Sequence, residues 1–322
     1  MKYLKYSDIS LVPNYSECHS RSDCSTSTVI GDKKYKLPII PANIKSVIDM
    51  RLAKWMSHCN YFYIMHRFDR DLAEDVANSQ DWDSISFSVG VKATDKMAIQ
   101  KISKRGHRVD YLTIDIAHGH CKRMETMIRW IKKHLPNVKI IAGNVATPEA
   151  VRALSEWGAD IVKVGIGQGS PCTTKDKTGF TLPMFSCIKE CSGLYSGAFE
   201  EYNEKHIPII ADGGIKCNGD IAKAIVAGAD LVMAGGIFAS CTDSPAIPTT
   251  INGVQHKAYF GSASAENKGH SNHIEGKLNH ITANTMTYEE KLSEIKQDLQ
   301  SSISYGGGEN LSVLKDVRYV EV

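Results

Sequence analysis

Short apolar segments alternate with amphipathic segments along most of the chain. β-Branched and apolar residues concentrate in eight runs of strand length, at Leu37–Ile44, Tyr61–His66, Ser84–Val91, Tyr111–Ala117, Lys139–Val145, Ile161–Ile166, Ile207–Ile215 and Leu231–Phe238. Between them lie stretches with helical spacing, such as Cys121–His134, Pro148–Trp157 and Gly219–Gly228. Thr147 before Pro148 is typical of a helix start.

Eight strand–helix alternations over roughly 250 residues predict a (β/α)8 barrel, the TIM-barrel type of α/β fold. We expect one catalytic domain over residues 1–322, with short terminal extensions. A doubly wound open sheet is the alternative, and it predicts an early GxGxxG motif, which follows none of the first strands. Polar residues also stand where the predicted strands end, for example Asn43, Arg67, Asp115 and Asn144. That edge of a barrel carries the active site.

Composition narrows the class of protein. The chain has 322 residues, 42% hydrophobic and 23% charged, which is typical of a soluble globular protein. A net charge of +2 gives no reason to expect nucleic acid or an acidic membrane surface as partner. No run reaches the length of a membrane span or of a signal peptide core. Nine scattered cysteines without a CxxC pair indicate reduced thiols in a cytoplasmic enzyme.

A glycine-rich loop with a cysteine follows the sixth predicted strand. Gly165, Gly167 and Gly169 allow tight turns and a close approach to a ligand. Exposed backbone N–H groups and the Ser170 hydroxyl suit an anion such as phosphate, and a Cys172 thiolate would be placed as a nucleophile. A glycine-rich turn around an inert, buried cysteine is the alternative.

Two further glycine loops follow the last two predicted strands, where barrels commonly bind phosphate. They contain Asp212-Gly213-Gly214 and Gly235-Gly236. Glycine N–H groups can bind phosphate oxygens, and the helix N-termini that follow favour the negative charge. The Asp212 carboxylate suits both hydroxyls of a ribose. The loops therefore indicate a nucleoside monophosphate, although two ordinary Gly-Gly turns remain the alternative.

The cysteine loop and the glycine loops, with other segments, resemble the IMP dehydrogenase/GMP reductase family. The matching segments are Tyr6–Pro13, Pro41–Asn43, Tyr61–Phe68, Gly143–Val145, Gly165–Thr174, Ala211–Ile215, Tyr259–Ser264 and Asp298–Tyr305. The Gly-Ser-x-Cys-Thr-Thr motif is highly specific to this family. The resemblance implies that the cysteine attacks C2 of a purine monophosphate and forms a thioimidate.

Three features favour the reductase branch of the family, in its shorter bacterial type. Only Arg67–Asp83 separates the second and third predicted strands, so the regulatory insertion usual in dehydrogenases is missing. No arginine lies between Arg152 and Arg318, so the Arg-Tyr pair with which dehydrogenases activate water is missing too. Ile274–Lys277 resembles the Glu-Gly-Lys segment of reductases. The resemblance thus implies NADPH-dependent reductive deamination of GMP to IMP and ammonia, a reaction of purine salvage and interconversion.

The resemblance also implies roles for single residues. Cys172 is the nucleophile, and Thr174 with Glu275 delivers a proton to the leaving amino group. From its position alone, Glu275 would be a solvated side chain in a polar loop. The backbone carbonyls of Gly167, Gly169 and Cys172 match those that hold a monovalent cation, such as K+, in family members.

Binding residues follow from the loops and from the resemblance. Substrate contacts are expected at Ser170, Asp212, Gly213, Gly214, Gly235, Gly236, Tyr259, Gly261, Ser262 and Gly276. Contacts to NADPH are expected at Ser20, Arg21, Arg67, Asp115, Ile116, Ala117, Ser302, Ile303, Ser304 and Tyr305, the last four across a subunit boundary of a homotetramer. A cation at Arg67 suits the 2′-phosphate, although a surface ion pair explains it equally well.

Two other functions stay open on the sequence. One is an IMP dehydrogenase that lacks its regulatory insertion. The other is a purine-nucleotide-binding barrel without turnover, against which Cys172, Thr174 and Glu275 argue, because binding alone needs no nucleophile.

Overall fold

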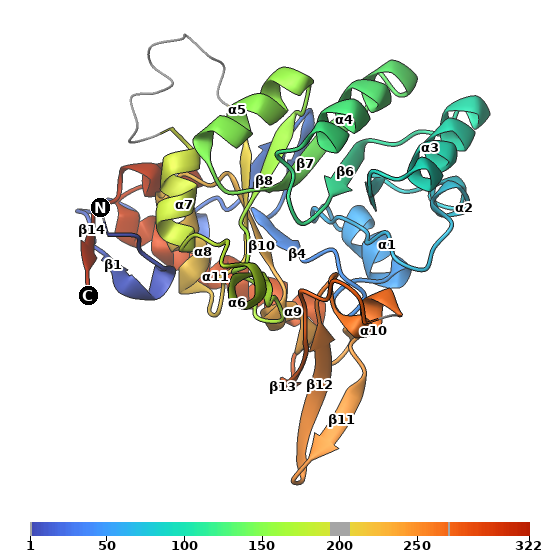
Figure 1. Ribbon diagram of the computed structural model, residues 1–322. Helices are drawn as coiled ribbons and strands as arrows, with labels where there is room; N and C mark the ends of the chain where they lie inside the picture. Colours follow the sequence, from blue (N-terminus) through green and yellow to red (C-terminus); the bar gives the residue numbers. More distant parts are fainter. Residues whose placement is uncertain (1, 194–206, 270) are drawn as a thin grey trace.

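The computed structural model describes residues 2–193, 207–269 and 271–322. Within these residues, seven parallel strands form one curled sheet (Figure 1). Their spatial order is β4 (Ile39–Pro41), β10 (Leu231–Ala234), β9 (Ile209–Asp212), β8 (Ile161–Val164), β7 (Lys139–Val145), β6 (Tyr111–Asp115) and β5 (Ser86–Val89). Each of these strands corresponds to a predicted one, so the α/β barrel class is confirmed.

Helices, several of which cover the outer face of the sheet, alternate with the strands (Figure 1). In chain order they are α1 (Met50–His58), α2 (Leu72–Ala77), α3 (Ala93–Arg105), α4 (Lys122–His134), α5 (Pro148–Trp157), α6 (Thr174–Thr178), α7 (Met184–Cys191), α8 (Gly219–Val226), α9 (Gly236–Ala239), α10 (Ala265–Lys268) and α11 (Tyr288–Gly306). Helix α5 begins and ends where the sequence predicts. Thr147 caps it by accepting the Ala150 N–H at 3.3 Å, and Gly158 ends it in the left-handed conformation.

The second predicted strand, Tyr61–His66, is wrong as a regular strand. Only Met65 pairs with β5, by a single parallel bridge to Phe87. The Tyr63 hydroxyl donates to the Ser84 carbonyl at 2.7 Å and accepts the Ser86 N–H at 3.3 Å. A side chain therefore takes the backbone groups that a ladder of strand hydrogen bonds would otherwise use.

This segment nevertheless fills the gap between β5 and β4. Phe62 and Ile64 are fully buried in one apolar cluster with residues of six strands of the sheet, including Ile40, Tyr111 and Leu231. Ile30 and Tyr35, from the hairpin of β2 (Thr28–Ile30) and β3 (Lys33–Tyr35), join the same cluster. A single cluster to which all these segments contribute side chains is the packed interior of a barrel.

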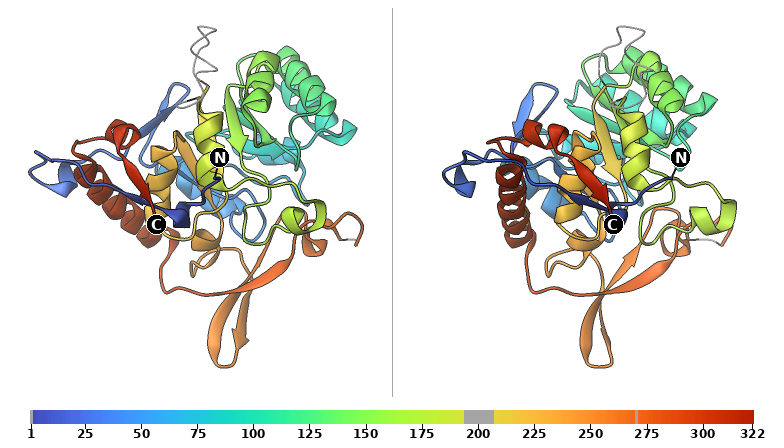
Figure 2. Two further views of the ribbon diagram at one scale, coloured as in Figure 1. Left: turned by 60° about the vertical axis from the view of Figure 1, so that its left-hand side comes forward. Right: turned by 90° about the vertical axis from the view of Figure 1, so that its left-hand side faces the viewer.

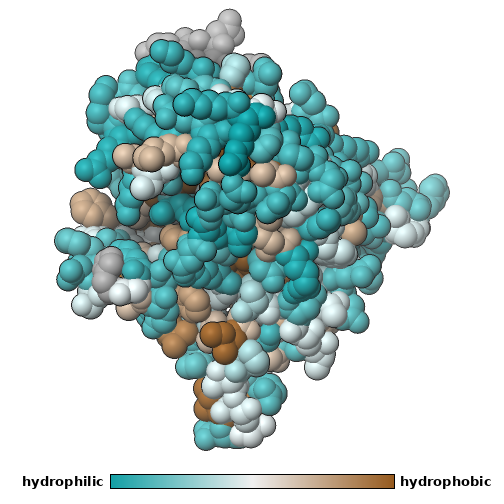
Figure 3. Space-filling view, turned by 90° about the vertical axis from the view of Figure 1, so that its right-hand side faces the viewer, coloured by the Kyte–Doolittle hydropathy of each residue, from teal (hydrophilic) through white to brown (hydrophobic). Residues whose placement is uncertain are grey.

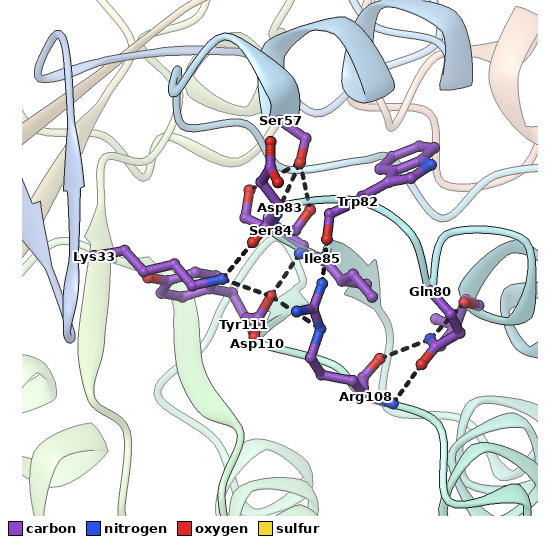
Figure 4. A network of polar contacts seen from close by, with 12 residues as sticks. Lys33, Ser57, Gln80, Trp82, Asp83, Ser84, Ile85, Arg108, Asp110 and Tyr111 are labelled. Carbon is purple, nitrogen blue, oxygen red and sulfur yellow. Dashed lines mark hydrogen bonds and ion pairs between the residues drawn. The ribbon is translucent and has the colours of Figure 1, made fainter.

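A polar network closes the edge where β5 and β6 begin (Figure 4). The Asp110 carboxylate accepts from Lys33 Nζ at 3.1 Å and from the Ile85 N–H at 2.8 Å. The Gln80 side chain pairs with both backbone groups of Arg108, at 3.1 and 2.9 Å, and Arg108 donates to the Trp82 carbonyl. Side chains thereby satisfy the backbone groups of the loops at this edge.

Three further groups of elements complete the fold. The first strand, β1 (Ile9–Leu11), pairs antiparallel with the last, β14 (Tyr319–Glu321), so the two termini lie side by side (Figure 2). Short 3-10 turns, η1 (Tyr6–Asp8), η2 (Arg21–Asp23) and η4 (Leu311–Asp316), also belong to these terminal parts. A separate antiparallel sheet of β11 (Pro248–Ile251), β12 (Val254–Phe260) and β13 (Leu278–Thr282) projects from the body (Figure 1).

The surface is mostly hydrophilic. Figure 3 shows one face on which apolar colour gathers towards the projecting sheet. Exposed apolar side chains in and beside that sheet include Ile247 and Val254, 65% and 49% exposed. No helix among the described residues is long and apolar enough to cross a membrane.

Candidate active site

The carboxyl ends of the strands surround a cavity of about 400 Å³. Segments from β4, β6, β7, β8 and β9 line it, together with β12 and the loop before β13. A larger cavity, of about 770 Å³, lies at the opposite edge, near Lys139, Asp160 and Asp230. Cysteine and histidine are missing from the residues that line the larger cavity. The smaller cavity is therefore the candidate active site, because it contains the predicted nucleophile.

The cysteine loop folds tightly where the sequence predicts it. Gly165 has a φ of +140°, and a Cβ there would overlap the carbonyl oxygen of Asp212. The loop then pairs with the segment before β13: the Thr173 N–H donates to the Glu275 carbonyl at 2.8 Å, and the Lys277 N–H to the Pro171 carbonyl at 2.8 Å. This pairing brings two segments that are a hundred residues apart in sequence to one place.

Cys172, Thr174 and Glu275 form a chain of hydrogen bonds. The Cys172 thiol donates to the Thr174 hydroxyl at 3.2 Å, and that hydroxyl donates to the Glu275 carboxylate at 2.7 Å. Cys172 is half-buried, and all three residues line the cavity. A hydroxyl between a thiol and a carboxylate can pass a proton in either direction.

A buried ion cluster lies under the same cavity. Lys163 Nζ contacts Asp115 Oδ1 at 2.8 Å and Asp212 Oδ2 at 2.7 Å, and only 3% of its side chain is exposed. Burial alone would lower the pKa of Lys163, but the two carboxylates outweigh it and raise that pKa. Burial would likewise raise the pKa of Asp115, but the Lys163 charge holds it below its usual value. Lys163 is therefore a buried cation paired with the Asp115 carboxylate, and its ammonium also contacts Asp212.

One oxygen of Asp212 remains available for a ligand. Asn144 Nδ2 donates to Asp212 Oδ2 at 2.8 Å, beside the Lys163 ammonium. Among the described residues, Oδ1 has no hydrogen-bond partner, and 22% of the side chain is exposed. With Oδ2 held by two donors, Oδ1 is free to accept hydroxyl groups from a molecule in the cavity.

Arg67 and His66 lie at the carboxyl end of the Tyr61–His66 segment, which takes the place of a second strand. Arg67 lines the cavity, its guanidinium lies 4.6 Å from the Phe68 ring centroid, and its buried Nε has no partner within the described chain. The positive charge of the guanidinium beside the cavity suits an anionic ligand. Burial, and then the nearby Arg70 and Lys45 charges, lower the pKa of His66 to about 4.

The structure brings many of the predicted site residues to the cavity. Those that line it are Arg67, Asp115, Ile116, Ala117, Gly167, Gly169, Cys172, Thr174, Asp212, Tyr259, Gly261, Ser262, Glu275 and Gly276. Ser170 lies just outside, where Asn279 Nδ2 donates to its carbonyl oxygen at 3.2 Å.

The glycines predicted to bind phosphate lie beside the cavity, and some of them contact neighbouring loops. The Gly214 N–H donates to the Gln168 carbonyl at 3.2 Å, and a Cβ on Gly213 would press on the Gln168 backbone. A Cβ on Gly235 would overlap the Tyr259 hydroxyl. Gly236 begins α9. These glycines therefore allow close packing between loops, and phosphate binding by them stays a prediction.

The remaining predicted cofactor residues lie together at another place. Arg21 donates to the Tyr305 hydroxyl at 3.1 Å, and its guanidinium lies 5.0 Å from the Tyr305 ring centroid. Ser20 caps η2 next to Arg21, and Ser302, Ile303 and Ser304 belong to α11 with Tyr305. This second group does not line the candidate cavity.

Lys163 is a site residue that the sequence motifs did not indicate. Its signal was present, because a lysine inside the run Ile161–Val164 stands at a position that is otherwise apolar. Lysine is rarely fully buried unless it is paired, so such a position predicts carboxylates on the neighbouring strands. No group of three or more His, Cys, Asp or Glu side chains suited to a metal ion occurs in the part of the chain that the structure describes. The predicted cation site of backbone carbonyls remains a prediction.

The fold and the site define an α/β barrel with a cysteine–threonine–glutamate chain at the carboxyl ends of its strands. A family model described as IMP dehydrogenase / GMP reductase domain matches residues 3–322. The chain belongs to this family.

Three relatives align with nearly the whole of this chain. A GMP reductase of Staphylococcus carnosus (strain TM300) is 44% identical over 326 residues, covering 100% of this chain and 97% of the relative. A GMP reductase of Paracidovorax citrulli (strain AAC00-1) is 42% identical over 325 residues, covering 99% and 96%. A GMP reductase of Staphylococcus aureus (strain JH9) is 44% identical over 328 residues, covering 100% and 97%.

Proposed function

We propose that this chain is a GMP reductase, which converts GMP, NADPH and two protons to IMP, NADP+ and ammonium, within purine salvage and interconversion. The hydrogen-bonded chain of Cys172, Thr174 and Glu275 is the observation that carries the proposal. The names of the full-length relatives support the same reaction. The whole chain acts as one catalytic barrel domain.

The thiol chain accounts for the first half of the reaction. Cys172 reacts as a thiolate, which adds to C2 of the guanine ring. Glu275 donates a proton through Thr174 to the amino group, because an amine leaves as ammonia far more readily than as an anion. The product is a thioimidate between Cys172 and the purine. Hydride addition at C2, with the hydride supplied by NADPH, then releases the Cys172 thiolate and IMP.

The ion cluster accounts for substrate orientation. Asp212 Oδ1 accepts the ribose hydroxyls, while Lys163 and Asn144 hold the other oxygen. Phosphate binds at the Gly213-Gly214 and Gly235-Gly236 loops, with further contacts from Ser170, Tyr259, Gly261, Ser262 and Gly276. The backbone carbonyl oxygens of Gly167, Gly169 and Cys172 would hold a monovalent cation such as K+, whose charge would stabilise the fold of the cysteine loop.

The cofactor site has two parts. Arg67, with its unpartnered Nε, and Asp115–Ala117 lie at the cavity and suit the half of NADPH next to the substrate. Ser20, Arg21 and Ser302–Tyr305 form the other part, supplied by a neighbouring subunit of a homotetramer. Their grouping away from the cavity favours this arrangement over a site within one subunit.

An IMP dehydrogenase reaction is the other candidate within the family. It needs water activated for attack on the thioimidate, and the stretch between Arg152 and Arg318 contains no arginine for that role. The discriminating experiment is one absorbance assay at the NADPH band with purified protein. We expect NADPH loss with GMP, in proportion to ammonia formed, and no steady NADH production with IMP and NAD. Steady NADH production from IMP, without NADPH loss with GMP, would assign the dehydrogenase reaction instead.

A further inference from the structure

Two cysteines lie in contact beside the terminal elements. Cys18 comes just before η2 and Cys24 directly after it, and their sulfur atoms are 3.5 Å apart. Cys18 is half-buried, whereas Cys24 is only 3% exposed. The sulfur atoms have to approach by about 1.5 Å to reach the length of a disulfide bond.

The surroundings fix one partner and leave the other accessible. The Cys24 carbonyl accepts from Gln300 Nε2 at 3.0 Å, which ties its backbone to α11. The Cys18 thiol donates to the Ser20 carbonyl at 3.1 Å within its own loop. A half-buried thiol on a loop can still meet an oxidant, and the buried thiol next to it can then resolve the product.

The other cysteines do not offer this combination. Cys187 and Cys191 lie one helical turn apart in α7, and both are buried. Cys241 is buried as well, and Cys217 is exposed on the loop before α8. All nine cysteines lie within the described residues, and none forms a disulfide.

We propose that Cys18 and Cys24 form an intramolecular disulfide by exchange with a low-molecular-weight disulfide such as glutathione disulfide. The Cys18 thiolate attacks one sulfur of glutathione disulfide, forms a mixed disulfide and releases one glutathione thiolate. The Cys24 thiolate then attacks the Cys18 sulfur and releases the second glutathione thiolate. The two cysteines are oxidised, the reagent is reduced to two glutathione molecules, and these take up the two thiol protons.

The pair encloses Ser20 and Arg21, so the bond has a consequence that rests on the proposed function. Oxidation removes the thiol that donates to the Ser20 carbonyl, and it draws the start of the loop towards Cys24. Arg21 then moves relative to Tyr305, to which it donates at 3.1 Å. If this group binds NADPH, the oxidised protein binds NADPH about tenfold more weakly, the effect of losing one charge-assisted hydrogen bond.

The bond itself is tested by peptide mapping of the intact protein after incubation with glutathione disulfide. Trypsin cuts after Arg21, so peptide Tyr6–Arg21 carries Cys18 alone and peptide Ser22–Lys33 carries Cys24 alone. We expect these two peptides joined by a disulfide, and separated again after reduction. Cys18→Ser should abolish the joined peptide, while Cys217→Ser, at an exposed thiol outside the pair, should leave it unchanged. Glutathione attached to Cys18, without the joined peptide, would overturn the proposal.

The consequence is tested by NADPH titration in a Cys172→Ser background, where oxidation of the nucleophile cannot interfere. Oxidation should weaken NADPH binding about tenfold, and Cys18→Ser in the same background should remove this sensitivity. Equal NADPH affinity in both redox states, with the joined peptide present, would overturn the effect on the cofactor. Failure of the reductase assay in the wild-type protein would leave the mapping result untouched, so the two proposals fail separately.

Discussion

Networks of polar side chains lie at both ends of the barrel, and they differ in the groups that the side chains bind. At the amino ends of the strands, Asp110 holds Lys33 and a backbone N–H, and Gln80 pairs with both backbone groups of Arg108 (Figure 4). At the carboxyl ends, Lys163 joins Asp115 to Asp212 instead.

The difference separates a structural network from a binding network. At the amino ends, the donors and acceptors are used to satisfy the backbone of loops, which closes that edge. At the carboxyl ends, Asp212 Oδ1 and Arg67 Nε have no partner within the described chain, and both residues line the cavity. A fold that leaves a carboxylate oxygen unpaired and places a guanidinium beside the same cavity is suited to a polar ligand.

The largest expected effect is the loss of the nucleophile at the carboxyl end. Cys172→Ala should reduce NADPH oxidation with GMP to background, because the proposed thioimidate forms on the Cys172 sulfur. GMP should still bind, since the ribose and phosphate contacts lie elsewhere. Steady-state assay and calorimetric titration with GMP measure the two properties. Substantial turnover in a clean preparation would exclude the covalent reaction.

Removal of the Lys163 charge should show that the network at the carboxyl ends contributes more to the free energy of unfolding than the network at the amino ends. Lys163→Met leaves Asp115 as a buried, uncompensated charge and should lower the free energy of unfolding by about 3–5 kcal/mol. Asp110→Asn, at the amino end, keeps an acceptor and breaks only two part-exposed ion pairs, with Lys33 and Arg108, so it should cost about 1 kcal/mol for each pair or less. Urea denaturation of both variants gives the comparison, and equal losses would contradict the distinction.

His66, at the carboxyl end of the barrel, should make the free energy of unfolding depend on pH. Its pKa falls from an ordinary 6.5 to about 4 in the fold, so the unfolded chain binds more protons between these values. Stability should therefore be complete above pH 6.5 and decline as pH falls towards 4, by about 3 kcal/mol in total. His66→Gln should flatten this decline in urea denaturation at a series of pH values. An unchanged slope would assign it to other groups.

A smaller effect is expected on nucleotide affinity. Asp212→Ala should weaken GMP and IMP binding alike, because both share the ribose, by about 1.5–3 kcal/mol for each charged hydrogen bond lost. Asp110→Ala, a matched loss of a carboxylate at the amino end, should leave both affinities unchanged. Calorimetric titration of each of the two variants with GMP and with IMP measures these affinities. Normal affinity in Asp212→Ala would give Asp212 a purely structural role.

The sequence predicted the barrel well because the periodic pattern and the helix signals are local. The run Ile161–Val164 and the cap at Thr147 need no distant partner to be recognised. The second strand was wrong because Tyr63 replaces ladder hydrogen bonds with its hydroxyl, a choice made by contact with Ser84 and Ser86 rather than by local pattern.

The site was predictable in part for the same reason. The cysteine loop is a continuous motif, so its glycines and Cys172 stood out. Glu275 is about a hundred residues away from that loop and was linked to Thr174 only by family resemblance. The Thr174 hydroxyl nevertheless donates to the Glu275 carboxylate at 2.7 Å. Lys163 was overlooked because its meaning depends on carboxylates from two neighbouring strands.

The most direct test of the central claim is a comparison of the two half-reactions in Glu275→Gln. Departure of the amino group needs a proton, whereas hydride transfer between IMP and NADP has no equal need. GMP-dependent NADPH oxidation should fall by about 10²–10⁴-fold, while the burst of NADPH formed from IMP and NADP changes little. Glu266→Gln, at an exposed glutamate in α10, should change neither. Near wild-type GMP turnover in Glu275→Gln would contradict the proton relay and remove the main residue-level support for the proposed function.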